Sequence, residues 1–142
     1  MKDFIEILIV DDTPENLTVL SNILRKENYK VRFAKNGEQA LRSVKAKLPD
    51  LIFLDVMMPV MDGFETCKRL KADSDAKDIP ILFISARSDF EGKTKAYEVG
   101  GLDFIEKPFN AKEVLLRVRT YVGLYKTQKE LAHKTKVLLN AE

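Results

Sequence analysis

The sequence predicts an α/β protein built on a doubly wound parallel sheet of five strands. Short apolar runs and helical segments alternate five times along the chain, which is the pattern of a parallel sheet with helices on both faces. The runs are short and mostly continuous, as in strands buried on both faces. Polar side chains directly follow three of the runs. Ligands bind outside the carboxyl ends of the strands in such sheets, so these polar side chains are candidate site residues.

The first half of the chain supplies three of the strands and two of the helices. We expect strands over 5–10, 29–34 and 51–55, and helices from Pro14 onward and over 38–47. The first helix begins at Pro14 because threonine at position 13 is a good N-cap and proline costs nothing at the first helical position. Its leucines recur at helical spacing and should face the sheet.

The second half repeats the alternation and ends in a long helix. We expect strands over 81–85 and 102–105, and helices over 64–72, 89–99 and from Asn110 to the end of the chain. Gly100 and Gly101 suit the left-handed conformation that ends many helices.

The central run, 51–54, delivers a single carboxylate, Asp55, before the chain turns at Pro59. A charge is costly inside a buried strand, so we expect Asp55 at the exposed carboxyl end. The first strand runs in the same way into Asp11 and Asp12, and the fourth ends at Ser85. If these strands are parallel neighbours, three carboxylates and a hydroxyl meet at one edge of the sheet.

Three neighbouring carboxylates repel one another, and a hard cation such as Mg²⁺ suits an all-oxygen site. One carboxylate could then attack phosphorus and form an acyl phosphate. The phosphoryl oxygens would need an ammonium and a hydroxyl, and Lys107 and Ser85 stand at the ends of the fifth and fourth strands. The alternative that the acids are ordinary cap and turn residues stays open at this point.

Composition excludes several other classes of protein. The net charge is +2, and residues 123–142, with four lysines and two glutamates, carry all of it. The rest is formally neutral, which gives no electrostatic reason to expect nucleic-acid binding. A single cysteine, Cys67, forms no disulfide framework, and we expect it to be a buried apolar residue rather than a reactive thiol. No run is long enough to span a membrane and the start does not resemble a signal peptide, so we expect a cytoplasmic protein without membrane binding.

Four short motifs together resemble the receiver domain of two-component response regulators, over roughly residues 5–122. They are Ile9-Val-Asp-Asp12, Leu54-Asp-Val-Met-Met-Pro-Val-Met-Asp-Gly63, Ile84-Ser-Ala86 and Ile105-Glu-Lys-Pro-Phe109. The resemblance implies a flavodoxin-like sheet with strand order 2-1-3-4-5. It also implies a signalling switch that accepts a phosphoryl group from a sensor histidine kinase or a phosphotransfer protein and turns over no metabolite.

The resemblance assigns roles to individual residues. Asp55 would be the phosphoacceptor, and Mg²⁺ would be held by Asp11, Asp12, Asp55 and the backbone carbonyl of Met57. Lys107 would contact the phosphoryl group, with a cis peptide bond to Pro108. Ser85 and Phe104 would be the switch residues that move when Asp55 is modified. Because Phe104 has no hydroxyl, packing alone would hold its inward state.

Two further positions are not fixed by the family pattern, and we expect them to tune the lifetime of the phosphorylated state. They are Met57, two residues after the acceptor, and Arg87, two residues after the switch serine. An apolar side chain at position 57 could shield the acyl phosphate from water.

Residues 123–142 are expected to be a helical extension of a receiver domain at 1–122. One row repeats at spacings of three and four: Tyr121, Leu124, Gln128, Leu131, Thr135 and Leu138. Two interpretations stay open, a frayed end or a helix that pairs with a second copy or leads into an output domain outside this sequence. Pairing over so short a row is weak, so a homodimer would also need the face of the fourth and fifth helices.

Two other functions are alternatives to the signalling switch. A receiver-like interaction module that is never phosphorylated remains the alternative. A phosphatase of the Asp-x-Asp type would need an acid two residues after the nucleophile, where this chain has Met57.

Overall fold

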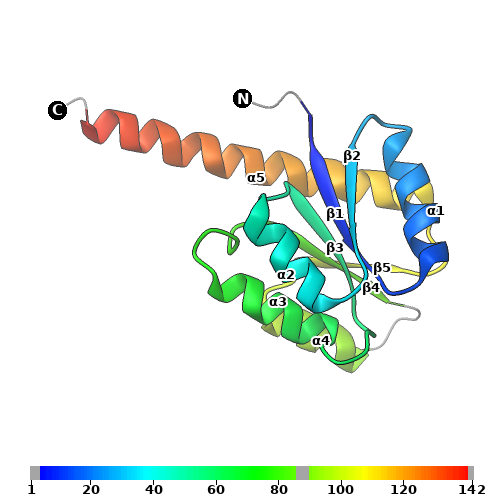
Figure 1. Cartoon of the computed structure of the whole chain (residues 1–142). Coiled ribbons are helices and arrows are strands. Elements are labelled where there is room, and N and C mark those ends of the chain that lie inside the picture. Colours follow the sequence, from blue (N-terminus) through cyan, green and yellow to red (C-terminus); the bar gives the residue numbers. More distant parts are fainter. Residues whose placement is uncertain (1–3, 86–89, 141–142) are drawn as a thin grey trace.

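The computed structural model describes residues 4–85 and 90–140 of the chain, and the elements follow the predicted alternation (Figure 1). Five helices and five strands are assigned in that part: β1 Glu6–Val10, α1 Pro14–Arg25, β2 Lys30–Ala34, α2 Gly37–Ala46, β3 Leu51–Asp55, α3 Gly63–Ala72, β4 Ile81–Ser85, α4 Phe90–Glu98, β5 Asp103–Glu106 and α5 Ala111–Asn140. The predicted elements are therefore all present. Their ends differ from the predicted ones by only a few residues.

The five strands form one parallel sheet in the order β2-β1-β3-β4-β5, as predicted. Every residue of β1 and β3 is buried. The register pairs Asp55 with Ile84 and Ser85 with Glu106, so the ends of β3, β4 and β5 lie level with one another. This alignment brings the polar residues after the runs to one edge of the sheet.

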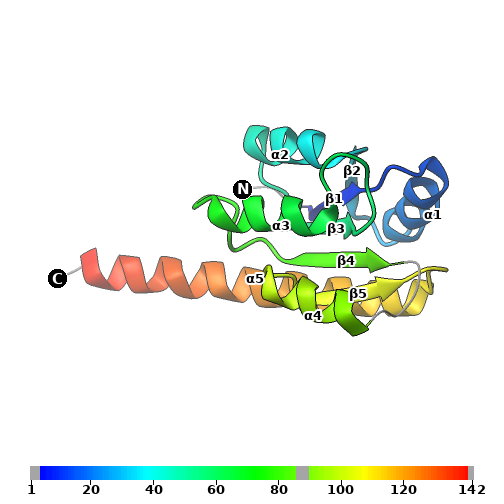
Figure 2. The ribbon, with the colours of Figure 1, turned by 90° about the horizontal axis from the view of Figure 1, so that it is seen from below.

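Two apolar layers cover the sheet, one on each face (Figures 1 and 2). The layer with α1 and α5 buries Leu20, Leu24, Val114 and Val118 against the strands. The layer on the other face includes residues of α2, α3 and α4, with Phe83 among its largest fully buried side chains. The inner strands β1, β3 and β4 are apolar on both faces for this reason and carry polar groups only at their ends, whereas the edge strand β2 is mostly not buried and carries Arg32 in its middle.

Helix starts follow local capping chemistry, with one correction to the sequence-based expectation. The side chain of Asn36 accepts a hydrogen bond from the backbone N–H of Gln39, and that of Asp62 accepts one from Glu65. Thr13 occupies the N-cap position of α1 but makes no side-chain cap. Its backbone N–H donates instead to Asp11 Oδ1 at 2.9 Å. Thr13 therefore serves the helix through its backbone carbonyl, which accepts from the N–H groups of Asn16 and Leu17, and serves the site through its own N–H.

Helix α5 continues past the sheet as one ribbon that reaches Asn140 (Figures 1 and 2). Packing against the domain extends to Tyr125, which is 6% exposed. Leu124, Leu131 and Leu138, by contrast, are more than half exposed. The extension is thus helical as far as Asn140 and carries three exposed leucines. Among the described residues, none of the helices has the length and apolarity needed to cross a membrane.

Val60, in the loop between β3 and α3, has a backbone conformation that suits glycine. Its φ is +69°, in the left-handed region, and its side chain is fully exposed. A β-branched residue in that region is strained by about 1–3 kcal/mol. We expect Val60→Gly to raise the free energy of unfolding by about 1 kcal/mol, the relieved strain less the added entropy of the unfolded chain.

Chemical denaturation checks this expectation, and Asn28 provides the matched control. Asn28 has nearly the same φ, +66°, but asparagine tolerates this region. Asn28→Gly should therefore change stability much less than Val60→Gly. Equal denaturation midpoints for wild type and Val60→Gly would mean that the loop stores no strain at Val60.

Candidate functional site

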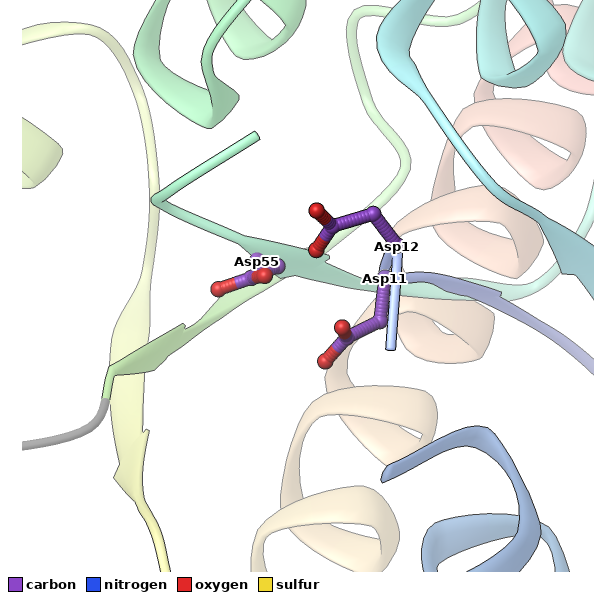
Figure 3. A group of neighbouring side chains, drawn as sticks. All are labelled: Asp11, Asp12 and Asp55. Carbon is purple, nitrogen blue, oxygen red and sulfur yellow. The ribbon is translucent and has the colours of Figure 1, made fainter. Parts of the chain in front are cut away.

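Three aspartates lie together at the carboxyl edge of the sheet (Figure 3). Asp11 and Asp12 follow β1, and Asp55 is the last residue of β3. Each offers one carboxylate oxygen, and these oxygens all lie within 4.8 Å of one another. The meeting of the three carboxylates, which was conditional on parallel neighbouring strands, therefore occurs.

Asp11 is completely buried, and backbone contacts on both sides fix its position. Its N–H donates to Ala34 O at 3.1 Å, extending the pairing of β1 with β2. Its Oδ1 accepts from the N–H of Thr13 at 2.9 Å, whereas its buried Oδ2 has no hydrogen-bond partner. Asp12, in contrast, is exposed.

Asp55 is buried, which corrects the expectation of an exposed strand end. It does lie at the carboxyl end of β3, but its relative exposure is only 4%. Burial and then the charge of Asp11 raise the pKa of Asp55 to about 7, while Lys107 and the Met57 N–H act in the opposite direction. The carboxylate is thus tolerated inside the protein because a cation and a backbone donor face it.

Lys107 is the cation at this edge. It follows β5, and its backbone N–H donates to Ser85 O at 2.8 Å, which continues the pairing of β4 with β5. Its Nζ lies 3.6 Å from Asp11 Oδ2 and 3.7 Å from Asp55 Oδ1. The peptide bond from Lys107 to Pro108 is cis, as the resemblance implied. One ammonium therefore faces the two buried carboxylates together.

The loop after Asp55 contributes two features that the sequence did not single out. The backbone N–H of Met57 faces Asp55 Oδ1 at 3.4 Å, while the Met57 side chain is 78% exposed. Gly63, at the start of α3, lies against the backbone of Asp55 and Val56, so an added Cβ would stand only 2.9 Å from Asp55 C. An Asp-Gly pair is by itself typical of a turn, and nothing local reveals this close approach.

The expected switch residues lie on the neighbouring strands. Ser85 ends β4, one residue beyond the partner of Asp55. Phe104 in β5 is 7% exposed, with its ring centroid 6.0 Å from that of Phe83 and 6.1 Å from that of Tyr97. The aromatic side chain is therefore in an inward state held by packing. Arg87, the second tuning position, lies outside the described residues.

The acidic cluster fits a hard divalent cation. Its donors are carboxylate oxygens, and the buried Asp11 Oδ2 has no hydrogen-bond partner. Lys107 is more than 3.5 Å from both acids and compensates them only partly. The cluster can therefore accept a metal ion, with Asp11, Asp12 and Asp55 as candidate ligands.

Cys67 belongs to the core and not to this site. It is fully buried on α3, and its Sγ donates to Val99 O at 3.4 Å. Burial raises the pKa of the Cys67 thiol to about 11, and the Lys71 ammonium offsets part of that rise. The expected burial of Cys67 is thus confirmed, and His133 is solvent-exposed.

A thiol reagent should therefore label Cys67 far more slowly in the folded protein than in urea at pH 8. The raised pKa alone reduces the thiolate about a hundredfold, and burial adds to this protection. The same shift leaves stability unchanged below pH 9 and lowers it as pH rises toward 11, because the unfolded chain ionises first. Timed labelling checks this expectation, and equal rates in both states would contradict it.

Comparison with known proteins places the chain among receiver domains. Residues 7–119 match the family described as the response regulator receiver domain. The transcriptional regulatory protein YvrH of Bacillus subtilis is 43% identical over 117 residues, which are 82% of this chain and 48% of YvrH. The response regulator PleD of Caulobacter vibrioides is 40% identical over 114 residues, which are 80% of this chain and 25% of PleD. The chain thus spans half or less of these relatives.

Solved structures agree with this family. A putative response regulator from Chloroflexus aurantiacus superposes with a TM-score of 0.83 and 36% identity, covering 85% of this chain and 99% of that one. NtrX from Brucella abortus superposes with a TM-score of 0.84 and 28% identity, covering 92% of this chain and 30% of NtrX. The chain belongs to the response regulator receiver domain family of two-component systems.

Proposed function

We propose that this receiver domain is a phosphorylation-controlled switch in which Asp55 accepts a phosphoryl group from a sensor histidine kinase or a phosphotransfer protein. The observation that carries the proposal is the position of Asp55, a buried carboxylate that faces both Lys107 and the acidic pair. An acid with a purely structural role would gain nothing from a second buried acid beside it, because each raises the cost of ionising the other.

Phosphoryl transfer would use these groups as follows. An oxygen of the Asp55 carboxylate attacks phosphorus, the bond between phosphorus and the donor's imidazole nitrogen breaks, and the nitrogen keeps the electron pair. The Lys107 ammonium, already 3.7 Å from Asp55 Oδ1, balances negative charge on the phosphoryl oxygens. The product is an acyl phosphate on Asp55. The domain assists its own modification and its later hydrolysis, and it turns over no metabolite.

The metal site is part of the same proposal. Asp11, Asp12, Asp55 and the backbone carbonyl of Met57 would hold Mg²⁺, which supplies positive charge opposite the phosphoryl oxygens when bound. Among these side chains, Asp11 has a fixed orientation, because it is buried and its Oδ1 accepts a hydrogen bond from the Thr13 N–H.

Modification would change the adjacent face of the domain. Ser85 would turn toward the phosphoryl oxygens, and Phe104 would shift from its present packing against Phe83 and Tyr97. These residues stand on β4 and β5 with α4 beside them, so the α4–β5–α5 face would change its partners. The uncharged balance of residues 1–122 gives this domain no attraction to nucleic acid.

The α5 extension gives the switch an output. The superposition on NtrX covers more of this chain than residues 1–125 could supply, so it includes part of the extension, within a longer protein. We propose that the extension connects the receiver to an output domain and that it pairs with a second copy, together with the α4 and α5 face. Its exposed leucine row supports that pairing.

Mass spectrometry after incubation with acetyl phosphate and Mg²⁺ tests the phosphoacceptor. The wild-type protein should gain the mass of one phosphoryl group, and Asp55→Ala should gain none. Asp62→Ala is a matched control, because Asp62 is a nearby aspartate that caps α3 rather than facing the site. No gain in the wild-type protein would instead favour a receiver-like interaction module that is not phosphorylated.

Replacing Met57 should shorten the lifetime of the phosphorylated state. Its side chain is largely exposed, while its backbone N–H faces Asp55, so it stands at the mouth of the site. We expect Met57→Asn to hydrolyse the acyl phosphate several-fold faster, because a polar side chain admits and orients water. Decay of the phosphorylated mass with time measures this rate. An unchanged rate would rule out shielding by Met57.

A further inference from the structure

Asp103, the first residue of β5, joins the switch strand to α5 through a single carboxylate. Its Oδ1 accepts a hydrogen bond from the backbone N–H of Phe104 at 2.8 Å. Its Oδ2 accepts from Arg117 Nη1 and from the Tyr121 hydroxyl, the latter at 2.8 Å. The group that holds the backbone of Phe104 therefore also holds two residues one turn apart on α5.

The two contacts on α5 are not equivalent. Arg117 has a second acid, Glu113, whose Oε1 lies 3.3 Å from Arg117 Nη2. Tyr121 donates its hydroxyl to Asp103, and burial together with this hydrogen bond raises the pKa of Tyr121 to about 12. The Tyr121 hydroxyl thus keeps its proton at neutral pH. A movement of Asp103 would leave Arg117 with Glu113 but would cost Tyr121 this acceptor.

Tyr121 is also the first member of the leucine row on the extension. Leu124, Leu131 and Leu138 follow it and are 57%, 59% and 70% exposed. Tyr121 itself is half-buried, on a shallow hollow that it lines together with Asp103 and Thr120. The three leucines are therefore open to solvent, whereas Tyr121 faces β5.

We infer that Asp103 is a catch that holds Tyr121 against β5 and thereby opposes pairing of the leucine row with a second copy of this chain. The inference rests on the proposed function, since movement of Phe104 is what releases the catch. A second copy is the occupant because the row carries leucine at intervals of seven, so a twofold pairing sets each leucine against its own counterpart. Beside the row, Thr127 and Ala132 are uncharged, whereas Lys134, seven residues after Thr127, carries a positive charge.

The length of the extension makes this catch effective. Beyond Tyr125 the helix continues for about 22 Å to Asn140, which is about two heptads. Pairing over so short a seam is weak, so the gain or loss of one contact at its first position shifts the balance measurably. A longer coiled coil would pair whether or not Tyr121 was held.

Release would follow from the covalent geometry of β5. Phe104 and Asp103 are adjacent, and the N–H of Phe104 is bound to the Asp103 carboxylate. A shift of the β5 backbone at Phe104 would move this N–H, so the Asp103 carboxylate would turn and the Tyr121 hydroxyl would lose its acceptor. The Tyr121 ring is then available to extend the leucine row by one position. Asp103 acts here as a positioning residue, because it touches neither the acceptor nor the metal ligands.

Sedimentation equilibrium of the unphosphorylated full chain tests the inference. Tyr121→Phe removes the hydroxyl and keeps the ring, so it should dimerise about 25-fold more tightly than wild type, the effect of one hydrogen bond in each of the two protomers. Asp103→Asn should act in the same direction. Thr120→Val is the matched control, because the Thr120 hydroxyl donates to Leu116 O within the same helix and not to β5. Thr120→Val should associate as the wild type does.

A second arm separates release of the catch from a general loosening of α5. Adding Leu131→Lys to Tyr121→Phe should abolish the extra association, since Leu131 is exposed in the monomer and its replacement disturbs no packing. Tyr121→Phe that associates no more tightly than wild type, or that stays monomeric, overturns the inference. So does equal tightening by Thr120→Val.

Neither arm needs phosphorylation. If the wild-type chain gains no phosphoryl mass, the proposed function fails while these comparisons still decide whether Asp103 restrains the leucine row. If the mass gain is observed but Tyr121→Phe behaves as wild type, the catch fails and the phosphoacceptor stands.

Discussion

Replacing Gly63 with alanine is expected to lower the free energy of unfolding by about 3 kcal/mol and to prevent phosphorylation of Asp55. The added Cβ would press on the backbone oxygen of Asp55 and would stand 2.9 Å from Asp55 C and 3.0 Å from Val56 Cα. These neighbours are backbone atoms, so no side-chain rotation relieves the contact. Alanine favours helices over glycine by at most about 1 kcal/mol, which is too little to offset the clash.

Gly123 gives a matched control for this substitution. It lies in α5, and an added Cβ there would meet no atom within 4 Å. Gly123→Ala should therefore raise stability by up to about 1 kcal/mol, the intrinsic helix preference of alanine. Urea denaturation measures both variants, and mass spectrometry after acetyl phosphate treatment measures the site. Opposite shifts of the two midpoints are expected. A Gly63→Ala protein as stable as wild type would show that the loop after β3 can move to accommodate the added Cβ at little cost in free energy.

The sheet could be predicted in detail because its signals are local. Buried strands need continuous apolar runs, and the polar groups that follow these runs must lie at the carboxyl edge. That logic brought Asp11, Asp55 and Ser85 to one edge. The order of the strands came instead from the resemblance to receiver domains, since a run such as β4 does not specify its neighbours.

The finer structure of the site depends on contacts between distant segments. The burial of Asp55 follows from the loop and strands around it and could not be read from the end of one run. Gly63 is required by the position of the Asp55 backbone, and nothing near Gly63 in the sequence indicates this. Asp103 meets Tyr121, 18 residues away, because α5 returns along β5. Neither the spacing of apolar residues nor a short motif indicates contacts between segments that are distant in the sequence.

Neutralising Asp11 is expected to stabilise the metal-free protein and to remove its response to Mg²⁺. Asp11 is completely buried beside Asp55, and its Oδ2 has no hydrogen-bond partner. Asp11→Asn keeps the acceptor for the Thr13 N–H and places an amide donor near Asp55, so it replaces repulsion by attraction. A gain of about 2 kcal/mol in the free energy of unfolding follows from removing one buried charge that Lys107 compensates only partly.

Added Mg²⁺ should make the wild-type protein more stable than Asp11→Asn. An ion that binds only the folded state stabilises wild type by about 2.7 kcal/mol at a hundredfold excess over its dissociation constant. The variant lacks one of the three carboxylates and should gain much less. Asp75→Asn, which removes an exposed acid outside the site, should respond to Mg²⁺ as wild type does. Thermal unfolding with EDTA and with Mg²⁺ compares the three proteins. An equal rise of the unfolding temperature in all three proteins would mean that the ion binds elsewhere. Only a site that includes Asp11 makes Asp11→Asn stabilising without Mg²⁺ and destabilising with it.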